Sequence, residues 1–193
     1  MKNKIALTNK TITNCALLIV HCSLLIVNCS FDYGASASDT DKPDIIMRDV
    51  EYVRVRQGDP LVRFQADYAE RHEEQQIMNL DTFSFEEFQD KGHSVNTVGS
   101  AGAASIELDS GNVDLSGGVY IKVESEDITI ETSTLRWKDK ERQLESGENE
   151  VVEVRRSDGT IFTGRGFSAD AREQTWQFNS GAQGLYVDTE EGE

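Results

Sequence analysis

The chain has 193 residues, 37% of them hydrophobic, and a net charge of −16. Its length is typical of one domain with a leader, and 15 glycines with only two prolines argue against a disordered or collagen-like chain. The acidic balance argues against nucleic acid or an anionic membrane surface as a partner, because both need a basic footprint. It is typical of a solvated protein surface.

Residues 1–30 differ in composition from everything that follows. They contain Lys2, Lys4 and Lys10 and no acidic residue, so the rest of the chain carries 16 basic and 35 acidic residues. The lysines are followed by an uncharged run from Thr11 to Phe31 that is mostly apolar. A basic segment before an apolar one predicts an export signal, and residues 1–30 are therefore interpreted as a signal peptide or membrane anchor.

Two interpretations of this leader remain open. The uncharged run is long enough for a transmembrane helix of about 20 residues. Alternatively, residues 25–29 resemble a relaxed lipobox with Cys29 as the lipidated residue, although Asn28 replaces the usual small residue. Both predict an exported, tethered body in the periplasm. Cys15, Cys22 and Cys29 all lie in the leader, so the body has no disulfide and no thiol nucleophile.

A first block of strands follows a short linker. Residues 31–44 are small, polar and acidic, which predicts a flexible connection. Alternating apolar residues predict strands over 45–55, 61–68 and 77–88, with a turn at 58–60. The apolar parity switches between Leu80 and Phe83, which predicts a bulge.

The stretch 112–156 organises the rest of the domain. Its apolar residues occupy odd positions over 119–123 and even positions over 128–130 and 152–154, so each segment can turn one apolar row inward. Residues 116–118, 138–140 and 146–149 are rich in Ser, Gly, Asp, Asn and Lys, and we expect turns there.

The C-terminal part continues the pattern. Further strands are expected over 160–167, 174–178 and 184–187, before an acidic tail over 189–193. Ser-Gly recurs at Ser116, Ser146 and Ser180. This weak period favours stacked β units over a closed sandwich. The sequence thus predicts one all-β domain of stacked antiparallel strands over 45–188.

Residues with catalytic or metal-binding chemistry are scarce. His72 and His93 lie in polar segments, where solvated surface positions are expected, and the body contains no Cys-x-x-Cys or His-x-His motif. Acidic pairs such as Glu124 and Glu126 fall at a turn between strands. We therefore predict no metal site, no cofactor and no enzyme activity.

A series of short motifs carries a family resemblance. In chain order they are Leu-Ser-Gly-Gly-Val (115–119), Ile-x-Ile-x-Thr (128–132), Leu-x-Trp (135–137), Glu-Ser-Gly (145–147) and Gly-x-Gly-Phe-x-x-Asp (164–170). With the apolar leader and the chain length, this series resembles the LptC family, the membrane-anchored periplasmic component of the lipopolysaccharide-export machine. More broadly it is similar to the LptA/OstA-like repeat. The resemblance covers roughly residues 44–187.

This resemblance implies an open, twisted β-jelly roll that conducts lipopolysaccharide across the periplasm. The chain would accept the lipid from an inner-membrane ABC transporter of the LptBFG type and pass it to LptA, with the acyl chains of lipid A in an apolar groove. Edge residues Ile45, Val53 and Val55 would face the transporter, and Leu185 and Val187 would face LptA. The expected groove lining is the apolar row Val119, Ile121, Val123, Ile128, Ile130, Leu135, Trp137, Phe162, Phe167, Trp176 and Phe178.

Three other functions fit the sequence. The chain could be an LptA-like bridge protein, which cleavage of the leader without lipidation would favour. It could be a structural surface lipoprotein, with which no lipid would copurify. It could also be a carbohydrate-active β enzyme, in which case changing Glu124 or Glu126 would abolish hydrolysis of a glycan.

Overall fold

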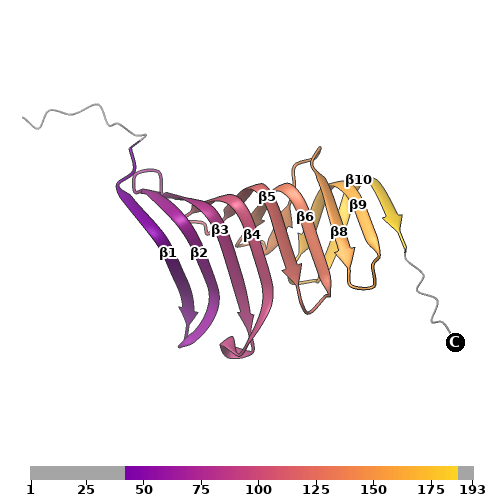
Figure 1. The fold of residues 1–193 in the computed structure, drawn as a ribbon, viewed down its shortest axis with the longest axis horizontal. Coiled ribbons are helices and arrows are strands. Elements are labelled where there is room, and N and C mark those ends of the chain that lie inside the picture. The colour runs from indigo at the N-terminus through magenta and orange to yellow at the C-terminus, as the bar shows by residue number, and fades with distance from the viewer. Residues whose placement is uncertain (1–41, 187–193) are drawn as a thin grey trace, which may run out of the picture. The chain divides into compact units, whose positions relative to one another are not determined.

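A computed structural model describes residues 42–186, which form antiparallel strands joined by short connections (Figure 1). The all-β prediction is confirmed. The strands are β1 (Ile45–Arg56), β2 (Asp59–His72), β3 (Ile77–Gln89), β4 (Ser94–Glu107), β5 (Val113–Val123), β6 (Ile128–Lys138), β7 (Gln143–Glu145), β8 (Val151–Arg156), β9 (Ile161–Asp170) and β10 (Thr175–Leu185), and a single 3-10 turn, η1 (Asp90–Gly92), joins β3 to β4.

The strands form one sheet in nearly sequential order, with β1 at one end and β10 at the other. Strands β7 and β8 follow one another in the same position of the sheet, between β6 and β9, and each pairs with both of them. Neighbouring strands are joined by tight turns, several of which end on a residue with a left-handed backbone, such as Gln76, Asp127 and Arg142. Sequential antiparallel pairing of this kind needs no long crossover.

The pairing of β6 shows that the sheet is divided into two parts along the length of its strands. Residues 128–131 of β6 pair with β8, whereas residues 136–138 pair with β7. Strand β9 is divided in the same way. Each long strand therefore contributes to two halves. The halves face each other, since the rings of Phe162 in one and Trp176 in the other have centroids 5.4 Å apart. Half A consists of residues 45–48, 68–72, 77–81, 103–107, 113–116, 135–138, 143–145, 167–170 and 175–178. Half B consists of residues 50–56, 59–65, 83–89, 94–100, 119–123, 128–131, 151–156, 161–165 and 180–185.

The crease between the halves runs through the middle of the strands. Left-handed backbone conformations occur there at Asp49 in β1, Thr82 in β3, Gly166 in β9 and Gly181 in β10. Positive φ is costly for a residue with a Cβ, and it bends the strand without ending it. The bulge predicted between Leu80 and Phe83 is absent, because the β3–β4 register is unchanged across these residues. The left-handed backbone of Thr82 bends the strand there instead.

The turn predicted at Ser116–Gly118 is wrong. These residues lie inside β5, where Gly117 and Gly118 have φ of 80° and 88° and the register with β6 shifts between Ser116 and Val119. A Gly-Gly pair suits a bulge within a strand as well as a hairpin turn. The short strands expected on either side are halves of one bent strand, and the same is true around Ser180 in β10.

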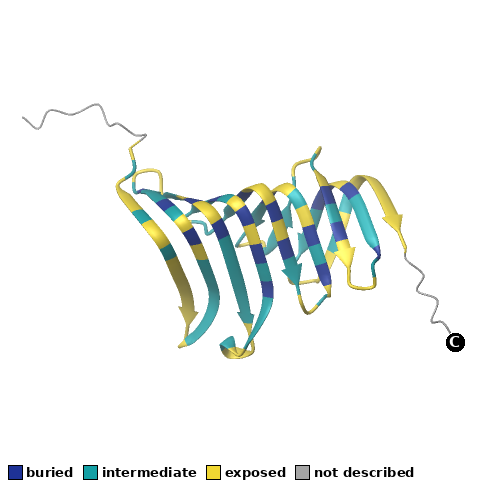
Figure 2. Cartoon of the chain, in the orientation of Figure 1, coloured by how far each residue is buried: buried dark blue, intermediate teal, exposed yellow. Residues whose placement is uncertain are grey.

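The hydrophobic core lies between the two halves (Figure 2). The most deeply buried large side chains are Leu80 from β3, Val152 and Val154 from β8, and Phe167 from β9. They come from both halves, so the apolar faces predicted from alternation do turn inward. The outward positions of the same strands remain exposed or half-buried.

Gly102 and Gly117 bring β4 and β5 into close contact at the crease. A Cβ on Gly102 would lie 2.8 Å from the carbonyl oxygen of Gly117, which is backbone and cannot rotate away. We expect Gly102→Ala to lower the free energy of unfolding by roughly 1–3 kcal/mol, measured by urea denaturation. Gly147→Ala is the control, because its Cβ would meet nothing closer than 3.9 Å. Equal stability of the two variants would contradict the close approach.

Candidate functional site

The interior face of the sheet is apolar along its whole length. In an antiparallel sheet, residues that are directly paired project to the same side and contact each other. In half A one row of such pairs runs Met78, Ile106, Val113, Trp137, Leu144, Ala169 and Trp176. In half B a facing row runs Tyr52, Phe64, Phe85, Gly99, Ile121, Ile130, Val154 and Phe162. The row in half A starts on β3, because Met78 is paired with Arg71 of β2, and the row in half B ends on β9. Together the two rows extend the apolar surface from β1 to β10.

The residues predicted to line a groove all lie on these inner faces, but the space between them is filled by side chains. Ile121 is 4% exposed and Ile130 is 3% exposed. Val119, Ile128, Leu135 and Phe167 are also buried, and Val123, Phe162, Trp176 and Phe178 are half-buried against them. Trp137 is half-buried beneath the guanidinium of Arg142, 4.6 Å from its ring centroid. An acyl chain would enter only if the halves moved apart.

Aromatic rings concentrate at the two ends of the interior. Near β10, Phe162 of half B and Trp176 of half A have ring centroids 5.4 Å apart, so this contact joins the halves directly. Near β1, Tyr52 stacks on Phe64 at 4.8 Å, and Phe83 lies 6.0 Å beyond. Flat rings at both ends leave the aliphatic side chains in the middle.

The aromatic cluster near β1 was missed in the sequence. The pattern that could have revealed it is a glycine opposite an aromatic residue: Phe85 is paired with Gly99, where an added Cβ would lie 2.2 Å from the ring. Gly164 makes the same space for Phe178, with a Cβ-to-ring distance of 2.4 Å. Each glycine lets a large ring lie flat over the neighbouring strand.

The two terminal strands carry most of the exposed large apolar side chains. Val53 and Val55 of β1 are 38% and 55% exposed, and Leu185 of β10 is 60% exposed. Ile45 lies at the start of β1 and is exposed as well. Ile46, Tyr52 and Tyr186 join this set, although the sequence did not single them out. Val187 and Cys29 lie outside the described residues.

A depression of about 580 Å³ follows the crease between β1 and β5. Asp49, Glu51 and Asp67 line it together with Phe83 and Ala101, and the predicted groove residues do not. Its carboxylates would repel an anionic head group. The crease is thus a different surface from the apolar interior.

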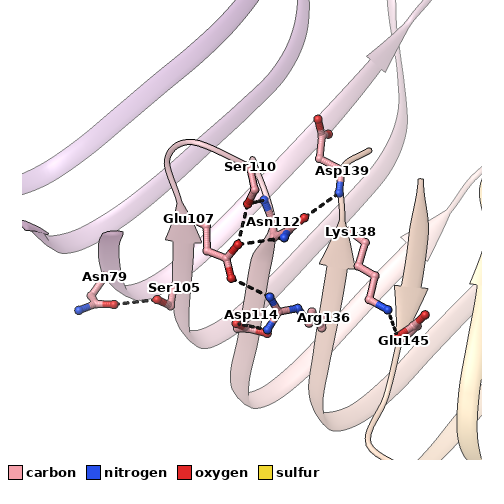
Figure 3. A network of polar contacts seen from close by, with 10 residues as sticks. All are labelled: Asn79, Ser105, Glu107, Ser110, Asn112, Asp114, Arg136, Lys138, Asp139 and Glu145. Atoms are coloured by element: carbon pink, nitrogen blue, oxygen red, sulfur yellow. Dashed lines mark hydrogen bonds and ion pairs between the residues drawn. The ribbon is translucent and has the colours of Figure 1, made fainter. Parts of the chain in front are cut away.

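A polar network covers the outer face of half A (Figure 3). Glu107 accepts hydrogen bonds from Ser110 (2.6 Å) and Asn112 (2.9 Å), and from the Arg136 guanidinium (2.6 Å), which also contacts Asp114. These hydrogen bonds hold the pKa of Glu107 below its ordinary value of 4.5. Those from Ser110 and Asn112 lower it most, and that from Arg136 lowers it less. Neighbouring strands of this half are therefore fixed in register from the water side.

His72 departs from expectation, whereas His93 does not. His93 is exposed, but His72 is buried at 8% exposure, and its Nε2 lies 3.9 Å from a carboxylate oxygen of Glu70. Within residues 42–186 no group of three or more His, Cys, Asp or Glu side chains could hold a metal ion. Over the same residues, no helix is long and apolar enough to cross a membrane.

Comparison with protein-family models decides the family. The model described as "Lipopolysaccharide-assembly, LptC-related" matches residues 15–187. The chain belongs to the LptC family. This family is one of periplasmic transport components and not of enzymes, so the function lies in lipopolysaccharide transport.

Other comparisons add little to this assignment. No curated protein matches the chain. Among solved structures, the chain is similar to LptH, the LptA-homologous periplasmic component of the lipopolysaccharide transport device of Pseudomonas aeruginosa. The identity is 14%, the match covers 66% of this chain and 95% of LptH, and the TM-score is 0.49.

The network around Glu107 predicts a pH dependence of stability. Because the pKa of Glu107 is lowered in the folded state, its contribution is present in full above pH 4.5 and is lost as the pH falls through the folded pKa. We expect Glu107→Gln to be less stable than the unchanged protein at neutral pH, with a difference that narrows below pH 4.5. Urea unfolding at several pH values measures this. The exposed Glu148 provides a control, since Glu148→Gln should leave the profile unchanged.

Proposed function

We propose that this LptC-family chain accepts lipopolysaccharide from the inner-membrane ABC transporter and passes it to an LptA-like bridge protein. The observation that carries the proposal is one apolar interior that runs without interruption between two unpaired sheet edges. Residues 1–30 would tether the chain to the inner membrane, through a transmembrane segment or through lipidated Cys29. Residues 31–44 would link this tether to the domain.

Acyl chains are suited to this interior. Each methylene transferred from water to an apolar environment contributes about 0.8 kcal/mol, so a few chains can offset the core contacts that are lost when the halves part. Parting the halves does not break the backbone ladder, because each strand keeps its neighbours within its own half. The groove would therefore form when lipid enters and close when it leaves.

The open edges supply the route to and from the partners. A terminal strand presents unpaired N–H and C=O groups that can pair with a strand of another protein. Strand β1 has 12 residues and β10 has 11, so both are long enough for an extended ladder. Tyr52 on β1 and Leu185 on β10 are exposed at the two edges. A strand of the partner that pairs with either edge would place its apolar side chains against them.

Photocrosslinking in cells tests the interior route. A photoreactive residue in place of Ile121 should capture lipopolysaccharide, because this side chain lies between the halves. The same residue in place of Lys122 should not, since the adjacent position projects to the opposite face, where Lys122 pairs with Glu124. Capture at neither position, in a folded and exported protein, would leave a permanently closed core and would contradict the conduit.

Two adjacent proline substitutions test the C-terminal edge. Successive N–H groups of a strand point to opposite sides, so one of Gly184 and Leu185 directs its N–H toward β9 and the other toward the open edge. Proline removes the donor in each case. We expect one of Gly184→Pro and Leu185→Pro to abolish copurification of an LptA-like protein with little loss of stability, and the other to lower stability. Unchanged copurification with both would contradict the edge assignment.

A further inference from the structure

One ion pair connects the margins of the two halves opposite the crease. Arg142 lies in the turn between β6 and β7, at the free end of half A, and its Nη2 donates to Glu87 Oε1 of β3 at 3.2 Å. Glu87 belongs to half B and is 55 residues away in sequence. The other ion pairs of the described residues join groups within one half, as Lys138 and Glu145 do at 2.6 Å.

Glu87 is placed on the inner face of the sheet. It is paired with Val62 on β2 and with Thr97 on β4, and it is two residues from Phe85, whose ring lies in the interior cluster. The Thr97 hydroxyl, which is buried, donates to the second oxygen of Glu87 at 3.3 Å. This carboxylate therefore stands at the rim of the apolar interior and not on the outer surface.

Arg142 is held in position on the opposite margin. Its guanidinium lies over the ring of Trp137, 4.6 Å from the centroid, and also 3.8 Å from Asp139. The Trp137 indole N–H donates to Asp139 at 3.3 Å, which fixes the ring under the guanidinium. The backbone of Arg142 has φ of 57°, a conformation that residues other than glycine adopt rarely.

We propose that Glu87, Arg142 and Trp137 form a latch that keeps the apolar interior closed until lipid enters. This inference rests on the proposed function, because it names the contact that lipid entry must break. The pair is suited to release, since the side chains of Glu87 and Arg142 are 36% and 38% exposed and water can solvate both charges once they separate.

The latch is tested in the full-length protein in cells, with the photoreactive residue at position 121. Glu87→Gln and Arg142→Gln should each raise the yield of captured lipopolysaccharide about two- to fivefold, the range expected when a partly exposed ion pair is lost. Lys138→Gln is the matched control, because it removes a pair of similar exposure that lies within half A. The exchanged pair Glu87→Arg with Arg142→Glu should bring the yield back toward that of the unchanged protein.

The latch would be overturned if both single variants captured as much lipopolysaccharide as the unchanged protein. It would also be overturned if Lys138→Gln raised the captured yield by the same factor. If position 121 captures lipid in no variant, the conduit itself fails, and the latch is then judged by a measurement that needs no lipid. The chain has two tryptophans, so 5-fluorotryptophan labelling gives two fluorine signals, and Trp137→Phe identifies the one from the latch.

Fluorine NMR reports whether half B holds Arg142 over Trp137. We expect Glu87→Gln and 1 M salt each to move the Trp137 signal toward its position in Arg142→Gln, and purified lipopolysaccharide to do the same. In Glu87→Gln and in 1 M salt the Trp176 signal should remain in place, because that ring packs against Phe162 and Phe178 and not against the ion pair. A Trp137 signal that is identical in Glu87→Gln and in the unchanged protein would overturn the latch whatever the lipid result.

Discussion

The bend in the middle of the long strands is the constraint on which the rest of this structure depends. Left-handed residues such as Thr82 and Gly166, with the bulge at Gly117 and Gly118, fold one sheet over on itself. Because the long strands bend instead of ending, each of them contributes to both halves, whereas β7 lies only in half A and β8 only in half B. The apolar faces of the two halves then meet, and they do so along the whole sheet from β1 to β10.

This construction distinguishes the contacts within a half from the contacts between the halves. Backbone ladders and the polar network around Glu107 hold the strands within a half, whereas away from the crease side-chain contacts hold one half to the other. Apolar contacts are not directional, so an acyl chain can replace them. The Glu87–Arg142 pair adds a directional contact at the margin, where the two halves are farthest from the crease that joins them.

The folded sheet also determines where partners can bind. A sheet in sequential order has two ends, and here both end strands expose apolar side chains, including Val55 on β1 and Leu185 on β10. Exposed, unpaired strands favour association with other strands. A sheet added at either end would continue both the ladder and the apolar interior, so in the proposed function one geometry would serve docking and lipid passage together.

Alternation of apolar and polar residues determined the strands and the inward direction of residues such as Ile121 and Ile130, because side chains on a strand alternate faces whatever their surroundings. The order of motifs also indicated the family. Only the tertiary structure decided that Ser116–Gly118 bends a strand, since Gly-Gly fits a turn equally well. It alone placed Glu87 beside Arg142, because a contact between residues 55 apart depends on how the sheet folds and leaves no local pattern in the sequence.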